Sequence, residues 1–306
     1  MNPDDNMPET ATRFGFVALI GAPNAGKSTL INRLVDSKVS IVTHKVQTTR
    51  MPIRAAYIDG PAQVILVDTP GIFAPKRRLD RAMVQSAWQG AEEADVIVLL
   101  IDARKGITEE DEAILDRLPD IPQPKFLVLN KVDLVERPVL LKLAERANAA
   151  TRFTDTFMIS ALSGEGVDDL KTAISNAVPA GVWHYPEDHL SDLPLRMLAA
   201  EITREKLFLR VHDELPYSLT VETEAWENRR DGSVKINQVI YVAREAHRRI
   251  ILGHRGEAIK GVSMEARKEM AELLGHPVHL FLFVKVRKNW VDDPDRYREL
   301  GLEFPG

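Results

Sequence analysis

The stretch Gly21-Ala22-Pro23-Asn24-Ala25-Gly26-Lys27-Ser28 has the pattern G-x-x-x-x-G-K-S, the phosphate-binding P-loop pattern. An apolar segment, Phe14 to Ile20, precedes it, and residues 29–35 follow with the apolar spacing of a helix. Strand, glycine-rich loop and helix is the context that this motif requires. The stretch therefore predicts a phosphate group surrounded by backbone N–H groups at a helix N-terminus.

Two side chains of this loop have predicted chemical roles. Lys27 would neutralise β- and γ-phosphate oxygens, and the Ser28 hydroxyl would be a ligand of Mg²⁺. A chance match in a glycine-rich turn is the alternative, and the flanking segments argue against it. The predicted nucleotide-binding residues of this segment are Gly21, Ala22, Pro23, Asn24, Ala25, Gly26, Lys27, Ser28 and Thr29.

The composition is that of an ordinary globular protein and excludes several classes of site. The 306 residues, 44% hydrophobic and 28% charged, suggest two domains. The sequence has no cysteine, which excludes disulfides and thiolate metal sites and fits a reducing cytoplasm. The apolar run Val96 to Ile101 is too short to span a bilayer. An acidic, polar start argues against a secretory signal, and residues 1–12 are expected to be disordered.

Up to about residue 180, short apolar runs alternate with helical patterns, and this alternation predicts an α/β fold. The expected sheet has six strands and is mainly parallel, with an antiparallel edge from a hairpin that turns at Asp59-Gly60-Pro61. Strands are expected at 14–20, 54–58, 63–67, 96–101, 125–129 and 156–159, and helices at 29–35, 80–94, 108–118, 138–150 and 167–178.

Three further motifs directly follow predicted strands and so fall on the rim that carries the P-loop. In Asp68-Thr69-Pro70-Gly71, Asp68 would contact Mg²⁺ and the Gly71 N–H the γ-phosphate. In Asn130-Lys131-Val132-Asp133, the Asp133 carboxylate can accept from two guanine donors that adenine lacks, while Asn130 contacts the base or ties the loop to the P-loop. Ser160-Ala161-Leu162 would give a backbone N–H to the guanine carbonyl.

These four motifs resemble those of the Ras-like GTPase superfamily, over roughly residues 13–180. The resemblance implies in-line attack of water on the γ-phosphate of GTP, promoted mainly by positioning and charge stabilisation. In the hydroxyl-rich loop after residue 37, either Thr48 or Thr49 would close on Mg²⁺ and the γ-phosphate. The implied catalytic residues are Lys27, Thr48, Thr49 and Gly71, and the implied metal ligands are Ser28, Asp68 and Thr48 or Thr49.

Two positions bear on the rate of hydrolysis. Ras-like enzymes carry a water-orienting glutamine just after D-x-x-G, whereas this chain has Ile72, so we expect slow intrinsic hydrolysis. Asn24 resembles the asparagine that coordinates K⁺ in related GTPases, and a turn-stabilising side chain is an equal alternative.

The C-terminal third has a different pattern and a basic segment. Residues 244–288 hold ten basic and five acidic side chains, a net charge of +5, although the whole chain carries −5. Helices are expected at 195–209, 247–252 and 264–274, and strands at 218–223, 235–242 and 278–286.

Gly253-His254-Arg255-Gly256 resembles the GxxG loop of a KH domain, which clamps single-stranded nucleic acid, and the element order resembles the α+β type II KH arrangement. Ile251, Ile259 and Val262 would form the floor of the groove. A core helix with a solvated basic face is the alternative interpretation. The predicted RNA-binding residues are Arg248, Arg249, Gly253, His254, Arg255, Gly256, Lys260 and Lys268.

A GTPase domain followed by a KH domain resembles the bacterial Era GTPase family. The resemblance implies a monomeric, cytoplasmic GTP/GDP switch that binds 16S rRNA near its 3′ end and assists 30S ribosomal subunit maturation. It also implies loose contact with the inner face of the membrane, for which the sequence offers no amphipathic or lipidated segment. The expected division is 1–12 disordered, 13–180 GTPase domain, 181–194 linker, 195–290 KH domain and 291–306 tail.

Two other functions remain compatible with these motifs. One is a signalling or cell-cycle GTPase whose basic segment meets anionic lipid. The other is an RNA chaperone in which the nucleotide is only structural.

Overall fold

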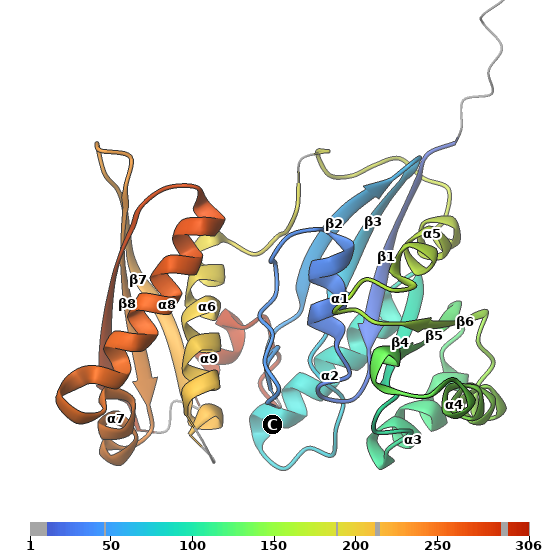
Figure 1. The fold of residues 1–306 in the computed structure, drawn as a ribbon, viewed down its shortest axis with the longest axis horizontal. Helices are drawn as coiled ribbons and strands as arrows, with labels where there is room; N and C mark the ends of the chain where they lie inside the picture. Colours follow the sequence, from blue (N-terminus) through green and yellow to red (C-terminus); the bar gives the residue numbers. More distant parts are fainter. Residues whose placement is uncertain (1–10, 46, 188, 212–214, 289–292, 306) are drawn as a thin grey trace, which may run out of the picture.

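The computed structural model describes residues 11–45, 47–187, 189–211, 215–288 and 293–305. The expected disorder of residues 1–12 therefore lies almost entirely outside the described residues. Two α/β units follow each other along the chain, one around a six-stranded sheet and one around a three-stranded sheet (Figure 1).

The first sheet has the strand order β2-β3-β1-β4-β5-β6, and its six strands are those that the apolar runs predict. Only the β2–β3 hairpin is antiparallel, and the other neighbours are parallel. Strands β3, β4 and β5 are buried along their whole length, which accounts for their mostly apolar sequences. The strands are β1 (Arg13–Ile20), β2 (Ile53–Asp59), β3 (Ala62–Asp68), β4 (Val96–Asp102), β5 (Lys125–Asn130) and β6 (Asp155–Ile159).

Five helices cover the two faces of this sheet. Helices α1 and α5 pack on one face, and α2, α3 and α4 pack on the other. Thr108 caps α3, because its hydroxyl accepts from the Asp111 N–H and the Asp111 carboxylate accepts from the Thr108 N–H in return. The helices are α1 (Lys27–Leu34), α2 (Arg78–Glu93), α3 (Glu109–Arg117), α4 (Arg137–Ala150) and α5 (Val167–Ala177).

The second unit is a sheet of order β7-β8-β9 with helices packed on one face. Strands β7 (Leu219–Asn228) and β8 (Val234–Val242) are antiparallel, whereas β8 and β9 (Val278–Val286) are parallel. Its helices are α6 (Leu195–Arg210), α7 (Glu245–Leu252) and α8 (Glu257–Leu274). The sequence-based start of α8 at Met264 is wrong by seven residues, because the helix begins directly after Gly256.

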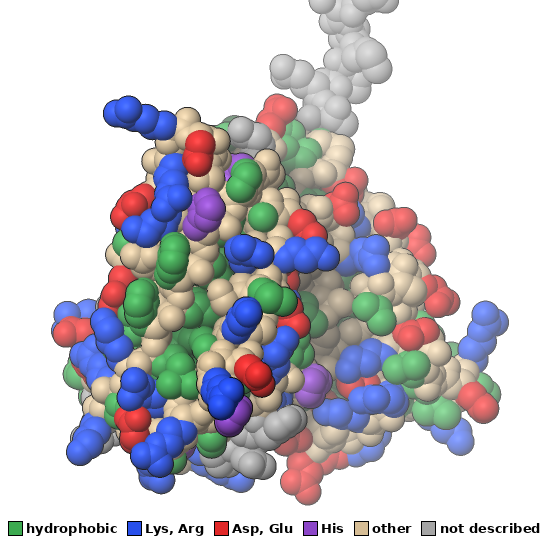
Figure 2. All heavy atoms as spheres, turned by 60° about the vertical axis from the view of Figure 1, so that its left-hand side comes forward, with side chains coloured by type: hydrophobic (Ala, Val, Ile, Leu, Met, Phe, Trp, Pro, Cys, Tyr) green, Lys and Arg blue, Asp and Glu red, His purple; other side chains and the backbone are tan. Residues whose placement is uncertain are grey.

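Figure 2 turns the second unit toward the viewer, and Lys and Arg side chains surround hydrophobic ones on that face. Exposed hydrophobic residues of this unit include Ile250, Met264, Phe281 and Phe283. Ile251 and Val262 are instead buried in its core, so the expectation that they line an RNA groove is wrong.

The connecting segment lies along the first sheet before it reaches α6. The Gln63 side chain donates to the Tyr185 carbonyl and accepts from the Tyr185 N–H, and the Trp183 indole donates to the Pro61 carbonyl at 3.0 Å. Trp183 therefore packs on the first unit. No helix in the described part of the chain is long and apolar enough to cross a membrane.

The last part of the chain returns to the first unit. Helix α9 (Pro294–Glu299) places Tyr297, and the residues after it place Leu302, against Leu79 and Met83 of α2. Tyr297 is almost completely buried there. The chain that follows the second unit therefore packs on the first unit in an apolar cluster, which we call the tail cluster.

Candidate functional site

The P-loop connects β1 to α1, and its two glycines adopt conformations that other residues rarely adopt. Gly21 has φ +149°, and a Cβ there would lie 2.3 Å from the Leu100 carbonyl oxygen. Gly26 has φ +107°, and a Cβ there would lie 2.1 Å from the Asn130 side-chain nitrogen. The loop thus fits only with glycine at both ends, and it leads into the N-terminus of α1.

Lys27 lies under this loop. Its ammonium donates to the carbonyls of Gly21, at 2.9 Å, and Ala22, at 3.2 Å. Burial lowers the pKa of Lys27 to about 8, although the Asp68 carboxylate acts in the opposite direction. A polyanion beside Lys27 would stabilise the ammonium form, which suits a phosphate-binding lysine.

Three hydroxyl groups converge on the Asp68 carboxylate at the end of β3. Its Oδ2 accepts from Ser28 at 2.8 Å, from Thr49 at 3.2 Å and from Ser40 at 2.7 Å. Ser28 and Thr49 lie 3.1 Å from each other. Ser40 has no motif around it in the sequence, and only the folding of its loop brings it here.

The Asp68 carboxylate is buried and incompletely satisfied. Its Oδ1 has no hydrogen-bond partner among the residues that the structure describes. Burial raises the pKa of Asp68, and the hydroxyl groups of Ser40 and Ser28 oppose this shift only in part. A buried acceptor with neighbouring hydroxyl oxygens is a donor set that fits Mg²⁺, which prefers oxygen ligands.

The structure distinguishes the two threonines that the sequence leaves equivalent. Thr49 belongs to the Asp68 cluster, but Thr48 faces its own loop. The Thr48 hydroxyl donates to the Lys45 carbonyl at 2.7 Å and lies 2.6 Å from the Thr43 hydroxyl. Thr49, and not Thr48, therefore lies with the oxygen groups around Asp68.

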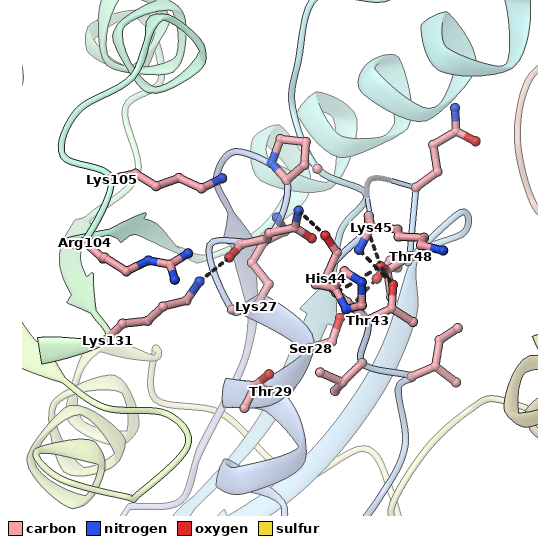
Figure 3. Close-up of a pocket in the computed structure, with 18 residues that line it drawn as sticks. Lys27, Ser28, Thr29, Thr43, His44, Lys45, Thr48, Arg104, Lys105 and Lys131 are labelled. Carbon is pink, nitrogen blue, oxygen red and sulfur yellow. Dashed lines mark hydrogen bonds between the residues drawn. The ribbon is translucent and has the colours of Figure 1, made fainter. Parts of the chain in front are cut away.

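A cavity of about 380 Å³ lies over these groups (Figure 3). The P-loop, the loop of residues 41–49 and the segment that follows β4 form its walls. Arg104 and Lys105, which the sequence analysis did not single out, extend toward the cavity in Figure 3. The cationic side chains that line it suit a polyanionic ligand: Lys27, Lys45, Arg104, Lys105 and Lys131.

Asn130 joins three of the four motifs. Its side-chain nitrogen donates to the Ala25 carbonyl in the P-loop at 2.8 Å. Its side-chain oxygen accepts from the N–H groups of Lys131, at 2.8 Å, and Ala161, at 3.0 Å. Of the two roles that the sequence allows, the structure has Asn130 tying its loop to the P-loop.

Lys131 is anchored at the same place. Its ammonium donates to the Asn24 carbonyl at 2.8 Å and to the Asp102 carboxylate at 2.5 Å. Asp102 ends β4 and was not predicted as a site residue, although an acid directly after a buried apolar strand is a usable signal. The stem of Lys131 thus spans the edge of the cavity.

Of the residues predicted to contact guanine, some are exposed to solvent and others have backbone N–H groups already bonded within the protein. Asp133 is exposed on a short 3₁₀ turn, Val132–Leu134, and Leu162 is also exposed. The Ser160 N–H donates to the Glu165 carbonyl at 3.0 Å, and the Ala161 N–H donates to Asn130. The expected contact of Ser160 and Ala161 with guanine would therefore have to share or replace these bonds.

Gly71 and Ile72 lie beside the P-loop. A Cβ on Gly71 would lie 3.0 Å from the Pro23 Cα, and the Ile72 N–H donates to the Gly21 carbonyl at 3.1 Å. The Ile72 side chain is buried in the apolar layer between the sheet and helices α2, α3 and α4. It offers no group that orients water.

Asn24 has a backbone φ of +67°, and its side-chain nitrogen donates to the His44 carbonyl at 2.9 Å. Asn24 therefore fastens the loop of residues 41–49 to the P-loop. Its side-chain oxygen is the only atom of that amide that could be a cation ligand.

The second candidate site is the turn between α7 and α8. Gly253 has φ +70°, and a Cβ there would lie 2.6 Å from the Ala258 Cβ, whereas Gly256 has φ +82° and open space. His254 and Arg255 are exposed at the tip, as are Arg249 and Lys260 nearby. These residues form a basic, closely approachable loop, which suits a phosphate backbone.

Two predicted RNA-binding residues lie differently. Arg248 forms an ion pair with Glu245 at 2.9 Å. Lys268 is twelve residues beyond Gly256, about 18 Å along α8, and pairs with Glu272. Lys268 is therefore separated from the GxxG loop.

Comparisons with known proteins agree with both sites. The sequence matches the family described as 50S ribosome-binding GTPase over residues 16–131 and the KH domain family over residues 214–291. It is 64% identical to GTPase Era of Brucella suis, covering 97% of this chain and 95% of that protein. It is 62% identical to GTPase Era of Afipia carboxidovorans, covering 98% of this chain and 99% of that protein.

Two solved structures resemble the whole chain. One is Era in complex with MgGDPNP and nucleotides 1506–1542 of 16S ribosomal RNA, with a TM-score of 0.90 and 38% identity. The other is a variant of Aquifex aeolicus Era bound to GDP.AlF4−, with the same TM-score and identity. Each alignment covers 95% of this chain and 99% of the compared chain.

Proposed function

The chain belongs to the GTPase Era family, and from this membership we propose that it binds 16S rRNA near its 3′ end and assists 30S subunit maturation under the control of GTP. As a member of this family it is a GTPase, which cleaves GTP to GDP and phosphate. The observation that carries the proposal is the presence of a cationic cavity over the P-loop and an exposed basic GxxG turn in one chain.

In the proposed nucleotide site, the P-loop N–H groups and Lys27 bind the phosphates, and Asp133 accepts from guanine. Ser28, Thr49 and Asp68 would hold Mg²⁺, which when bound neutralises charge on the phosphate oxygens. Two observations support this donor set: Ser28 and Thr49 hydroxyls bond to the Asp68 carboxylate, and its Oδ1 has no partner within the described part of the chain. The Gly71 N–H, beside Pro23, would detect the γ-phosphate.

The attacking water needs another orienting group, because Ile72 is buried and apolar. We propose that backbone groups of the loop of residues 41–49, or a partner, supply it, and that intrinsic hydrolysis is slow. Turnover by the isolated protein at the rate of an activated GTPase would contradict this assignment.

We also propose that Asn24 contributes a ligand to a K⁺ ion. The positive φ of Asn24 and its position between the P-loop and His44 support it. Hydrolysis rates in KCl and NaCl at matched ionic strength test it, and equal rates would leave Asn24 with its structural role alone.

For RNA, we propose that the backbone of a single strand lies against Gly253–Gly256, with Arg255, Arg249 and Lys260 at phosphates. The proposed division is a GTPase domain at 13–180, a linker at 181–194 and a KH domain at 195–290. We further propose that the protein is a monomer in the cytoplasm, with any membrane contact peripheral.

The test is crosslinking of bound RNA in cells, with the Arg255→Asp variant as the comparison. Arg255 has φ +50°, a conformation that aspartate tolerates, so the variant should fold. Lys142→Asp, an equal charge change on exposed α4, is the matched control. We expect crosslinks at the 3′ end of 16S rRNA with the parent and the control, and their loss with Arg255→Asp.

Other outcomes identify the competing functions. Crosslinks to unrelated RNA fragments would indicate a general RNA chaperone. Recovery with anionic membranes and without ribosomal subunits would indicate a membrane-bound signalling GTPase. Sedimentation with small subunits in GTP and in GDP completes the comparison.

A further inference from the structure

Helix α6 of the second unit contacts residues 37–45 and 47–52, which we call the switch loop, near both ends of this segment. Two consecutive residues of α6, Arg204 and Glu205, make these contacts. Both are almost fully buried, although they are charged. Burial of charged side chains is costly unless they are paired, so these contacts hold α6 and the switch loop in a fixed relation.

Glu205 holds the first end of the switch loop. Its carboxylate accepts from the Val42 N–H at 2.8 Å and from the Lys38 ammonium at 2.7 Å. Burial opposes ionisation, but hydrogen bonds from Lys206 and Lys38 keep the pKa of Glu205 below its ordinary value. Lys38 also pairs with Glu269 of α8, the helix that starts at the GxxG turn.

Arg204 holds the other end of the switch loop. Its guanidinium donates to the Gln47 carbonyl at 3.2 Å and also to the Thr48 carbonyl. Glu201, one turn earlier, orients the guanidinium through Nε at 2.8 Å, and Phe208 lies beneath it. Arg204 therefore fixes the two peptide groups that immediately precede Thr49.

Arg50, directly after Thr49, reaches in the opposite direction. Its guanidinium donates to the Leu219 carbonyl at 2.8 Å and to the Pro216 carbonyl at 3.0 Å, both in the second unit. Thr49 is thus held on its N-terminal side by Arg204 and on its C-terminal side by Arg50. Between these two attachments, its hydroxyl lies 3.2 Å from Asp68.

We propose that Arg204 is a positioning residue for Thr49, so that contact of α6 with the switch loop raises affinity for Mg²⁺–GTP over GDP. The proposal rests on the proposed function, which makes Thr49 a ligand that acts with Mg²⁺ and the γ-phosphate. Binding couplings are reciprocal, so Mg²⁺–GTP strengthens the docking of α6 on the switch loop by the same factor.

The test compares Arg204→Gln and Arg204→Lys with the parent in the full-length chain. Gln reaches too little to bond both carbonyls, and Lys keeps the charge without the two-pronged geometry. We expect affinity for a fluorescent nonhydrolysable GTP analogue with Mg²⁺ to fall about tenfold in Arg204→Gln and less in Arg204→Lys. Affinity for fluorescently labelled GDP should change less than about twofold, because GDP lacks the γ-phosphate.

Arg196→Gln is the matched control. Arg196 is also an α6 arginine that donates to backbone carbonyls, those of Thr223 and Glu224, but these lie within the second unit. We expect it to leave both affinities unchanged. Thermal unfolding of every variant shows whether it is folded, and an equal loss of GTP and GDP affinity in Arg204→Gln would mean a merely structural role.

Thr49→Ala, alone and combined with Arg204→Gln, distinguishes the role of Thr49 from that of Arg204. If Arg204 acts through Thr49, adding Arg204→Gln to Thr49→Ala produces no further loss of GTP affinity. If Thr49→Ala itself has no effect with Mg²⁺, the assignment of Thr49 in the proposed function fails. If Thr49→Ala weakens GTP binding but Arg204→Gln does not, only the inference about Arg204 is overturned.

Discussion

The Lys131 ammonium lies 2.5 Å from the carboxylate of Asp102, a pair that joins the loop of residues 130–133 to the end of β4. Asp102 is buried, whereas Lys131 is partly exposed at the edge of the cavity. The same ammonium also donates to the Asn24 carbonyl, so it connects β4, the P-loop and the loop of residues 130–133.

Asp102→Asn should therefore weaken guanine-nucleotide binding. The variant leaves Lys131 without its charged partner, and such a loss in a partly buried pair costs about 1–3 kcal/mol. We expect GDP and GTP affinity to fall by about tenfold or more. Titration with a fluorescent guanine nucleotide measures the effect, with Asp116→Asn on exposed α3 as the control. Unchanged affinity would show that Lys131 is positioned without Asp102.

Asp68→Asn should raise the stability of the nucleotide-free protein and abolish its Mg²⁺-dependent nucleotide binding. Burial favours the neutral form of Asp68, so the folded chain binds a proton at pH values where the unfolded chain has lost it. Stability therefore falls as the pH rises from the ordinary carboxyl pKa through the raised pKa of Asp68, and the loss is complete above it. We expect the variant without nucleotide to be more stable by about 1 kcal/mol at neutral pH, while Mg²⁺-dependent nucleotide binding is lost.

Asp80→Asn is the contrasting variant for this experiment. Asp80 is also buried, but its oxygens accept from Gln47 and from the N–H groups of Lys76 and Arg77. It should lose about 1 kcal/mol of stability, since a capping carboxylate is removed. Chemical denaturation without nucleotide measures both values, and a destabilised Asp68→Asn protein would contradict the argument.

The pH dependence of nucleotide binding should follow Lys27. Its pKa is about 8 in the folded chain, against an ordinary value of 10.5. Between these values the unfolded chain binds a proton that the folded chain does not, so this residue makes the nucleotide-free protein more stable as pH rises. Phosphate binding requires the ammonium, so the complex takes up a proton above about pH 8.

Calorimetry at pH 9 in two buffers of different ionisation enthalpy counts this proton. We expect uptake of close to one proton and an affinity that falls up to about tenfold per pH unit above 8. At pH 7, Lys27 is already ionised and should contribute no uptake. Zero uptake at pH 9 would mean that Lys27 stays charged in the free protein.

Asp133→Asn should change the base that is preferred. The carboxylate is complementary to the two donors of guanine, whereas an amide can donate to the 2-carbonyl of xanthine. We expect GTP affinity to fall at least about 100-fold and xanthosine triphosphate to become the better ligand. Competition binding with both nucleotides measures this, and Asp133→Ala, which lacks the amide, should not gain xanthosine affinity.

The sequence predicts the strands of the first sheet to within about two residues, because apolar runs and hairpin turns are local signals. Helix α8 was predicted seven residues short because Gly261 interrupts the helical pattern near its start. In the structure, Gly261 lies inside α8 close to Arg210 of α6, where a Cβ would be 2.5 Å from the flexible end of the arginine side chain.

The motifs of the nucleotide site are also local signals. Because each follows a predicted strand, the sequence also predicts that they meet at one edge of the sheet. Ser40 and Arg204 were missed because each reaches the site only through tertiary packing, whereas Asp102 was missed although its position at the end of β4 is a local signal. Arg204 is more than 150 residues from the peptide groups it bonds, as its contact with Gln47 spans 157 residues. Thr48 and Thr49 differ only in orientation, which a sequence pattern does not encode.

The tail cluster has a consequence for how the protein is made. Leu79 and Met83 of α2 are covered by Tyr297 and Leu302, which are synthesised more than 200 residues later. All strands of the first sheet leave the ribosome well before this cover exists. The nascent first unit therefore carries an apolar patch that stays open to chaperones, or to other nascent chains, until the residues of α9 emerge.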